Sequence, residues 1–479
     1  MTVRVAVVGG GITGLTVAFT LLEARPDLEV NVIEADQRVG GKVRTGRFAG
    51  HQVDAGADAF LARVPEGIDL CRRLGLADEL VTPAVRSAYL YSRGALRPFP
   101  GGLVLGVPTD LDALARSGVI SPEGITRAAL DLTMGPDQPG TPDESVGALV
   151  RRRLGDEIYD VLVGPLLSGV NAGNADHLSV AAGTPQFAAA LEQHGSLIAG
   201  ARAQRQASVA TGAPVFFGLP GGTQTLTDTL AERILAAGGR IQTGTTVDAI
   251  ATAGGTGYGV TTRSRSSGVE VVGALETDVV IVSTPMFVTG RLLAPFAPGA
   301  AREMSELEYA SAVMVVLAIA REEIDHPLDA SGFLVSGSEP LVLTACSWAS
   351  SKWAHLADDR VAILRASAGR HHDRRALEMG DEELVEVLLD DLATTMGVRG
   401  RPEEVRVTRW DRSLPQFRPG HLERVQRWHQ ELQEKAPGLF ATGAGFEGLG
   451  LPACIRQARA TAEQALDLPL LRSSATPPA

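Results

Sequence analysis

The sequence contains few cysteines and no long hydrophobic run. Its 479 residues include only Cys71, Cys346 and Cys454, which lie far apart and form neither a CxxC motif nor a zinc-binding spacing. This sparse set argues against a disulfide framework and indicates a reducing compartment. No window of roughly 18 uncharged apolar residues occurs, so we expect no membrane-spanning helix. The first apolar strand begins at Val3 with no secretory signal before it, which favours a cytoplasmic location.

Basic charge is also in short supply. Lys and Arg together number 44 against 56 Asp and Glu, giving a net charge of −12, and no long basic run occurs. This balance argues against nucleic acid as a partner. The basic cluster at residues 151–153 has no long apolar face beside it. We therefore expect a solvated helix there, with at most peripheral membrane contact.

Side-chain sets for acid–base, nucleophilic or metal chemistry are missing too. The nearest approach to a metal pair is His371 with His372. Adjacent residues of a strand point to opposite faces, so this pair predicts no metal site. No Ser/His/Asp set and no pair of carboxylates stands out, and we predict no catalytic residue.

Glycine, by contrast, is abundant, and its placement near the N-terminus is informative. An apolar run, residues 3–8, leads into Gly9-x-Gly11-x-x-Gly14, a helical pattern follows, and a second apolar run ends at Glu34. Gly9 permits a tight turn, Gly11 admits a pyrophosphate to a helix N-terminus, and Gly14 permits close helix–strand packing. Glu34 is placed to accept the ribose hydroxyls. The segment predicts a dinucleotide-binding unit.

The fingerprint does not separate NAD from FAD, but the residues after it help. The run after Glu34 has Arg38, Gly40-Gly41 and Lys42. It resembles the flavin oxidases of the amine-oxidase superfamily. The resemblance implies that Arg38 and the glycine turn lie beside the cofactor's phosphates and ribose, where basic charge is favourable. The alternative is that Arg38 and Lys42 belong to a solvated loop.

Two further segments extend the resemblance. Residues 53–59 are similar to the loop that passes the flavin ring in this superfamily, where small residues let the backbone approach; a plain Gly/Ala loop is the alternative. Residues 439–443 predict a strand, and Pro452 begins a helix that extends to about Ala465. The resemblance implies that this helix N-terminus faces the flavin's pyrimidine end. We therefore expect residues 9–14 and 443–452 to meet.

Motifs in the middle and at the end of the chain narrow the resemblance to one branch of the superfamily. Residues 164–179, 217–226 and 443–455 are similar to porphyrinogen oxidases, and residues 343–370 and 414–421 to their soluble branch from monoderm bacteria. The resemblance implies oxidation of coproporphyrinogen III to coproporphyrin III in heme biosynthesis. One non-covalent FAD per chain would accept six electrons in three steps, with O2 reduced to hydrogen peroxide. A ferrochelatase is the partner implied for product handover.

The resemblance also assigns site residues. It implies a cofactor site of Gly9, Gly10, Gly11, Ile12, Thr13, Gly14, Glu34, Ala35, Arg38, Gly41, Lys42, Gly56, Ala57, Asp58, Ala59, Val247, Trp410, Gly443, Leu449, Gly450 and Leu451. It implies a substrate pocket lined by Leu334, Trp348 and Ser367, with Arg365 as partner of a propionate. The alternatives are core packing for Leu334 and Trp348 and an ordinary sheet-end charge for Arg365.

Two positions depart from relatives. Ala88 stands near the position where plant and mitochondrial protoporphyrinogen oxidases carry a propionate-binding arginine, and Ser367 stands where some relatives carry an aromatic residue. A smaller residue widens that wall and suits a tetracarboxylate. Protoporphyrinogen IX oxidation, another flavin amine oxidase or a carotenoid desaturase are the alternative activities. A prenyl-binding protein related to GDP-dissociation inhibitors, without flavin, is the alternative without enzyme activity.

The length exceeds one hydrophobic core, so we expect several domains. The fold class predicted is α/β: a Rossmann-like FAD-binding domain (residues 1–62, 207–289 and 435–471), an α+β substrate domain (63–92 and 290–434) and a helical insertion (93–206). A hairpin turning at Arg93-Gly94, a linker over residues 202–208 and a disordered tail from residue 472 complete the prediction.

Overall fold

The computed structural model describes residues 2–136, 142–211, 214–254, 257–266, 269–371 and 373–472. Most of the tail predicted to be disordered, residues 473–479, lies outside these ranges, as does His372 of the predicted surface pair.

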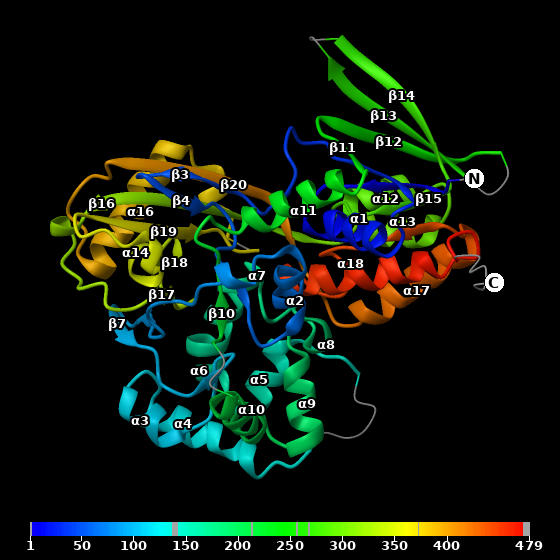
Figure 1. The fold of residues 1–479 in the computed structure, drawn as a ribbon. Helices are drawn as coiled ribbons and strands as arrows, with labels where there is room; N and C mark the ends of the chain where they lie inside the picture. Colours follow the sequence, from blue (N-terminus) through cyan, green and yellow to red (C-terminus); the bar gives the residue numbers. More distant parts are fainter. Residues whose placement is uncertain are drawn as a thin grey trace.

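A parallel sheet with the N-terminal strand at its centre forms the first layer (Figure 1). Its five strands run in the order β11 (Arg240–Gln242), β2 (Glu29–Ile33), β1 (Arg4–Val8), β15 (Val279–Val282) and β21 (Leu439–Ala441). Every pairing in it is parallel, and all four residues of β15 are buried. The chain goes from β1 to β2 on one side and joins β15 on the other. The switch point where such sheets bind ligands therefore lies between β1 and β15.

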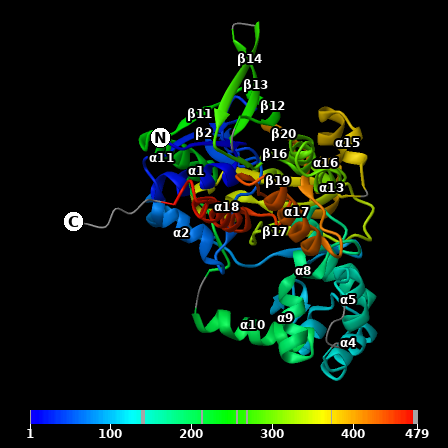
Figure 2. The same cartoon turned by 90° about the vertical axis from the view of Figure 1, so that its right-hand side faces the viewer.

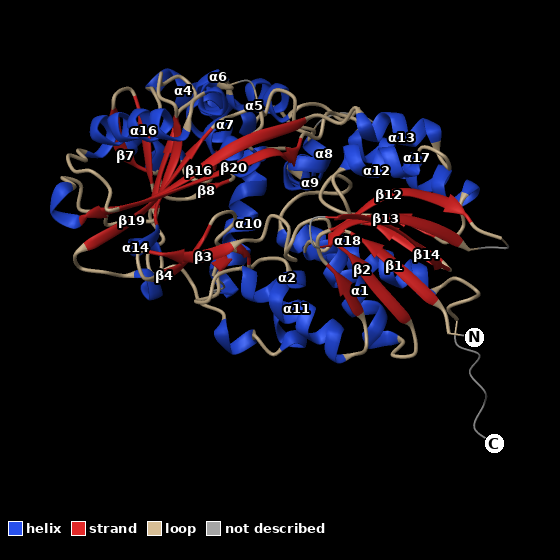
Figure 3. Cartoon of the chain, turned by 90° about the horizontal axis from the view of Figure 1, so that it is seen from above, coloured by secondary structure: helices blue, strands red, loops and turns tan. Residues whose placement is uncertain are grey.

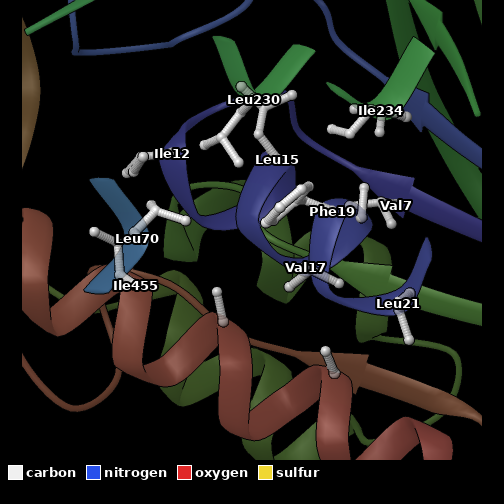
Figure 4. Close-up of a cluster of buried hydrophobic side chains, with 14 of the residues drawn as sticks. Val7, Ile12, Leu15, Val17, Phe19, Leu21, Leu70, Leu230, Ile234 and Ile455 are labelled. Atoms are coloured by element: carbon white, nitrogen blue, oxygen red, sulfur yellow. The ribbon is translucent and has the colours of Figure 1, made fainter. Parts of the chain in front are cut away.

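Helices cover both faces of this sheet. On one face, α1 (Ile12–Ala24) is surrounded by α2 (Pro65–Leu74), α11 (Gln224–Ala236) and α18 (Leu451–Leu466). Figure 4 shows their apolar side chains converging on α1. On the other face lie α12 (Met286–Leu293), α13 (Pro298–Ser305) and α17 (His421–Lys435). This is the doubly wound α/β layer that the sequence predicts.

A small antiparallel sheet is inserted between β11 and β15. It contains β12 (Thr245–Thr252), β13 (Tyr258–Ser266) and β14 (Val269–Thr277), and it projects from one end of the molecule (Figure 1).

A larger sheet lies beside the parallel one (Figure 3). Its seven strands run in the order β20 (Glu404–Pro415), β16 (Tyr309–Ala320), β19 (Val361–Ala368), β18 (Leu343–Trp348), β17 (Gly332–Val335), β6 (Tyr89–Ser92) and β7 (Ala95–Pro98). Only the β17–β6 pairing is parallel, and α16 (Asp381–Met396) packs on one face. The predicted hairpin between β6 and β7 is confirmed, because Arg93 and Gly94 have φ of +53° and +69°.

Helices form a third region below both sheets (Figure 2). They are α3 (Leu111–Ser117), α4 (Pro122–Ala129), α5 (Val146–Leu154), α6 (Asp156–Ile158), α7 (Gly164–Asn171), α8 (Val180–Gly183), α9 (Pro185–His194) and α10 (Leu197–Thr211), with a π-helical turn at Tyr159–Val163. The linker predicted for residues 202–208 is wrong, because that segment belongs to α10. Arg and Gln favour helix, and Arg202 Nε donates to the Thr109 carbonyl at 2.7 Å. A polar stretch therefore forms the outer part of this helix.

The solvated helix predicted for residues 151–153 is wrong for one of the three residues. Arg153 is 1% exposed, and its Nε donates to Asp131 Oδ1 at 2.7 Å.

Short elements connect these layers. They are the ladders β3 (Thr45–Phe48) with β4 (His51–Asp54), β5 (Phe60–Leu61) with β10 (Phe216–Phe217) and β8 (Leu103–Val104) with β9 (Val107–Pro108), and the helices α14 (Ala349–Lys352) and α15 (Arg375–Glu378).

The tightest backbone contact between a strand and a helix predicts a stability effect. A Cβ atom added to Gly14 would lie 1.9 Å from the Gly9 carbonyl oxygen, whereas one added to Gly11 would meet nothing within 4 Å. We expect Gly14→Ala to lower the free energy of unfolding by about 3 kcal/mol or more, and Gly11→Ala by less than about 1 kcal/mol. Thermal unfolding of the two variants measures the difference, and equal melting temperatures would contradict the packing described.

Candidate functional site

Three strand ends lie together at the carboxyl edge of the parallel sheet. Gly9 follows β1, Ser283 follows β15, and Gly443 lies just beyond β21. Ser283 Oγ lies 3.0 Å from the Val8 carbonyl oxygen and 3.1 Å from that of Gly9, and it shares its single proton between them. A Cβ atom added to Gly443 would lie 4.0 Å from both the Ser283 carbonyl oxygen and Thr13 Oγ1. The two ends of the chain therefore meet at this edge, as expected from the sequence.

The N-terminus of α1 opens onto free space. Gly11 is the capping residue, and no side chain caps the helix. Cβ atoms added to Gly9 or Gly10 would meet other atoms at 2.9 Å, but one added to Gly11 would meet none within 4 Å. Ile12 and Thr13 begin the helix, so their amides belong to its first, uncapped turn. An open space at a helix N-terminus has the shape and polarity of an anion cradle.

Glu34 directly follows β2 at the same carboxyl edge of the parallel sheet. Its Oε2 accepts from the Gly10 amide at 2.6 Å, and its Oε1 accepts from the Asp36 amide at 2.8 Å. The Glu34 carbonyl accepts from the Thr245 amide at 2.8 Å. This bond brings the start of β12 to the end of β2, where Val247 is buried. Glu34 is thus a carboxylate held by backbone at the tip of a strand, beside the exposed Ala35.

Arg38 organises the turn at residues 39–43. Its guanidinium donates to the carbonyls of Val39 at 2.8 Å, Gly41 at 2.7 Å and Val43 at 3.1 Å. The turn is joined to the α1 cap by a bond from the Gly40 amide to the Gly10 carbonyl at 2.8 Å. Within the described residues, the buried Arg38 Nε has no hydrogen-bond partner. Most of this guanidinium therefore holds its own loop, and Nε remains for a ligand.

Lys42 bonds the backbone of the seven-stranded sheet. Its Nζ donates to the Ser413 carbonyl of β20 and lies 6.0 Å from the centre of the Tyr309 ring. Burial lowers the pKa of Lys42. These contacts attach the Lys42 side chain to β20.

Side chains from the seven-stranded sheet and from the residue before α11 hold residues 55–58. Trp410 Nε1 donates to the Ala55 carbonyl at 2.9 Å, and Arg365 Nη2 donates to the Gly56 carbonyl. Thr223 Oγ1, just before α11, lies 3.0 Å from the Ala57 carbonyl oxygen. A Cβ atom added to Gly56 would lie 2.9 Å from the Lys42 carbonyl oxygen, so this position requires glycine. Ala59, which directly precedes β5, is half-buried.

Asp58 is the anion of a buried ionic cluster. Its carboxylate accepts from Lys352 Nζ at 2.9 Å, Trp353 Nε1 at 3.0 Å and Arg365 Nη1 at 2.7 Å. Burial alone would raise the pKa of Asp58, but the two cations outweigh it and hold the pKa well below its usual range. Asp58 is therefore ionised, and it ties its loop to β19 and α14.

The turn before α18 is also built to stay open. Gly448 and Gly450 have φ of +128° and +100°, and no side chain caps α18, whose first residue is Leu451. Gln457 accepts from the Glu447 amide at 2.9 Å and donates to the Gly448 carbonyl at 3.0 Å. The turn thus presents a second uncapped helix N-terminus at the same edge.

Two residues attach this turn to the rest of the molecule. His421 Nε2 lies 2.7 Å from the Phe446 carbonyl oxygen and is fully buried. Leu449 packs against the hydrophobic core of the helical region. The turn therefore joins the parallel sheet, α17 and the helices below.

One face of the seven-stranded sheet carries a row of half-buried side chains. Leu334, Ala345, Ser367 and Met314 occupy paired positions on four neighbouring strands, and all are half-buried. Ser367 Oγ lies 3.9 Å from Met314 Sδ. A Cβ atom added to Gly169 of α7 would lie 3.2 Å from Leu334 Cδ2, so α7 borders this row. We call these four residues the wall row.

The structure corrects two of the predicted substrate contacts. Trp348 pairs with Leu364 on the opposite face of the sheet, where it is fully buried, with its ring 4.7 Å from His326 and 6.1 Å from Phe333. Trp348 is core because successive residues of a strand alternate faces, and this places Ser347 on the side of the wall row. Arg365 shares that side, but Asp58 and Gly56 occupy its guanidinium, so a propionate has no access to the same donors.

The sequence reasoning missed several residues that shape the site. They are Ser283, Thr223, Lys352, Gln457 and His421. The signal for Ser283 was its place directly after a buried strand. Thr223, Lys352 and His421 act through contacts distant in sequence, which no local pattern shows. Gln457 bonds residues nine and ten positions before it, across the turn that precedes α18.

Comparison with known proteins identifies the family. The model of the flavin-containing amine oxidoreductases matches residues 12–466. The chain belongs to this family. It is 33% identical over 472 residues to the coproporphyrinogen III oxidase of Bacillus subtilis, covering 97% of this chain and 98% of that protein. It is 32% identical over 474 residues to that of Staphylococcus aureus, covering 97% and 99%.

A crystal structure extends the comparison to the fold. A protein from Exiguobacterium sp. 255-15, assigned as a protoporphyrinogen oxidase, superposes with a TM-score of 0.84 at 32% identity, covering 97% of this chain and 98% of that one. The predicted fold, the resemblance and the enzyme class are confirmed by these findings. They favour the enzyme over the prenyl-binding alternative.

The residues of this family member fit a flavin. The open space beside Gly11, the unpartnered Arg38 Nε and the uncapped α1 and α18 are polar features that the described protein atoms leave unsatisfied.

Within the described ranges, no group of three His, Cys, Asp or Glu side chains could hold a metal ion. No described helix combines the length and apolar character needed to cross a bilayer.

His421 predicts how stability depends on pH. Burial lowers its pKa to about 4, below the ordinary value of 6.5. The unfolded chain therefore takes up a proton before the folded protein does, and stability falls as the pH drops from 6.5 to 4, by up to about 3 kcal/mol. We expect melting temperatures to show this loss. His421→Gln should flatten it, and the exposed His194→Gln should not; an unchanged slope in His421→Gln would contradict the assignment.

Proposed function

We propose that the protein is an FAD- and O2-dependent oxidase that converts coproporphyrinogen III to coproporphyrin III and releases hydrogen peroxide. The observation that carries the proposal is the junction at residues 55–58. There the dinucleotide edge, through Lys42 and Thr223, meets the wall face of the seven-stranded sheet, through Arg365 and Trp410. Near-full-length similarity to coproporphyrinogen III oxidases supports this substrate.

The order of groups along the edge favours a dinucleotide. The edge continues from Glu34, near Val247, past the open space at Gly11 to residues 55–58 and Gly450, which is the order that adenosine, pyrophosphate and ring would need. Burial raises the pKa of the Cys454 thiol, which lies close to Thr13. A protonated, buried thiol is a poor nucleophile. These features support one non-covalent FAD per chain.

The chain's own residues position and orient the substrate and shield it from water. A bound flavin supplies a two-electron acceptor for each of three oxidations, and O2 takes up the electrons. Porphyrinogens have weak meso C–H bonds, so the driving force lies in the substrate. The wall row offers an apolar surface for the macrocycle, and α7 excludes water from it. No side chain is assigned as an acid or base.

The wall row also bears on specificity. Ser367 is small and lies between Met314 and Ala345 in the register. A low wall there leaves room for a macrocycle with four propionates, which favours coproporphyrinogen over protoporphyrinogen. The product would pass to a ferrochelatase that accepts coproporphyrin.

Spectra and steady-state kinetics test the proposal directly. We expect the purified protein to show flavin absorption and to release FAD on denaturation. We expect a higher kcat/KM on coproporphyrinogen III than on protoporphyrinogen IX, with one hydrogen peroxide per two electrons and no turnover of amines. Equal or better efficiency on protoporphyrinogen would overturn the substrate assignment, and a colourless protein that cannot be reconstituted would overturn the cofactor.

Ser367 and Trp348 form a matched pair for the pocket itself. We expect Ser367→Tyr to raise KM for coproporphyrinogen roughly tenfold, because it fills the wall row. We expect Trp348→Phe to lower the free energy of unfolding by about 1–3 kcal/mol without changing KM, because Trp348 faces the core. The opposite pattern, with KM sensitive only to Trp348, would show that the wall has been assigned to the wrong face.

A further inference from the structure

Two successive backbone carbonyls beside the site are bound by side chains from the seven-stranded sheet. Trp410 Nε1 donates to the Ala55 carbonyl at 2.9 Å, and Arg365 Nη2 donates to the next carbonyl, that of Gly56. Thr223 Oγ1 lies 3.0 Å from the Ala57 carbonyl oxygen and shares its single proton with Asp54 Oδ1 at 2.8 Å. Carbonyls in loops are usually left to water, so this arrangement fixes the orientation of consecutive peptide planes.

Fixing a carbonyl fixes the amide that follows it. In a planar trans peptide the C=O of one residue and the N–H of the next point in opposite directions. The amides of Gly56 and Ala57 are therefore directed away from Trp410 and Arg365. Within the described residues, neither these amides nor that of Asp58 has a hydrogen-bond acceptor. Gly56 and Asp58 are half-buried and Ala57 is exposed, so this loop is not sealed within the core. Backbone donors that no protein group accepts point to a ligand or water that accepts.

Arg365 is buried and held in one position by its partners. It is 5% exposed, and its Nη1 lies 2.7 Å from the Asp58 carboxylate, which also accepts from Lys352. One guanidinium thus bonds the loop at two places, the Gly56 carbonyl and the Asp58 carboxylate. The planar fork of arginine suits two such contacts, which the single ammonium of lysine reaches less well.

We propose that Arg365 and Trp410, assisted by Thr223, are positioning residues that present the amides of residues 56–58 as a row of donors to the acceptor edge of the flavin ring. This inference rests on the proposed function, which places the ring at this junction. Arg365 then acts on the cofactor through the backbone rather than on a substrate propionate.

Amide hydrogen exchange on the wild-type protein gives the most direct test. We compare the FAD-loaded enzyme with the same protein after flavin removal, at single-residue resolution. Slower exchange of the Gly56, Ala57 and Asp58 amides in the loaded enzyme is expected. Equal exchange in both forms would overturn the inference. Failure to bind any flavin would instead overturn the proposed function, so the two failures are distinguishable.

Two variants test the positioning residues. Trp410→Phe removes only the donor to Ala55, and Arg365→Lys removes the fork. We expect each to weaken flavin binding about five- to tenfold, as for a lost hydrogen bond, and to speed exchange at residues 56–58. We also expect a shift in the flavin's midpoint potential, which a purely structural role would not produce. Trp410→Phe keeps the test decisive if Arg365→Lys does not fold.

Matched controls come from similar side chains elsewhere. Trp428→Phe removes a buried indole donor that bonds Glu303 at 2.8 Å, and Arg153→Lys alters a buried arginine that bonds Asp131 at 2.7 Å. Both should lower stability and leave flavin affinity unchanged. If Trp410→Phe and Arg365→Lys behave like these controls, in affinity, exchange and potential, the positioning role is refuted.

Discussion

The close approach of two backbone segments at Gly14 and Gly9 is the constraint on which the site depends. With a Cβ position only 1.9 Å from a carbonyl oxygen, no side chain is tolerated, and α1 must begin directly against the end of β1. Ser283 bonds the same carbonyl from β15, which ties the switch point together. That contact positions the open N-terminus of α1, and α18 packs on α1 to bring the second uncapped terminus beside it.

A buried ionic cluster gives the second half of the site its position. Asp58, Lys352 and Arg365 come from a loop, α14 and β19, and they replace water as one another's partners. Removing one member of such a cluster leaves a buried charge unpaired, which makes the geometry strict even if the net stabilisation is small. The cluster therefore fixes where the seven-stranded sheet stands relative to the dinucleotide edge.

The geometry of the N-terminal β-α-β unit could be predicted from sequence because its rules are local. Gly9, Gly11, Gly14 and Glu34 act through backbone geometry within one β-α-β unit, and a short pattern records that geometry. The substrate side could not be predicted residue by residue. Whether Trp348 or Ser347 lies on the face of the wall row depends on the register of β18 against β19. A shift of that register by one residue would exchange the two faces. Arg365 was misjudged because its partner, Asp58, is distant in sequence. The linker error at residues 202–208 shows that polarity alone does not end a helix.

The two sides of the site therefore differ in how freely they can change. The cofactor edge consists of backbone amides, glycines and helix termini, and a substitution there meets neighbouring backbone at once. The wall row consists of side chains on a sheet whose opposite face, with Trp348, carries the packing. Residues such as Ser367 can change size without disturbing that core. The wall row can therefore vary in size while the Asp58 cluster holds the loop at residues 55–58 against the seven-stranded sheet.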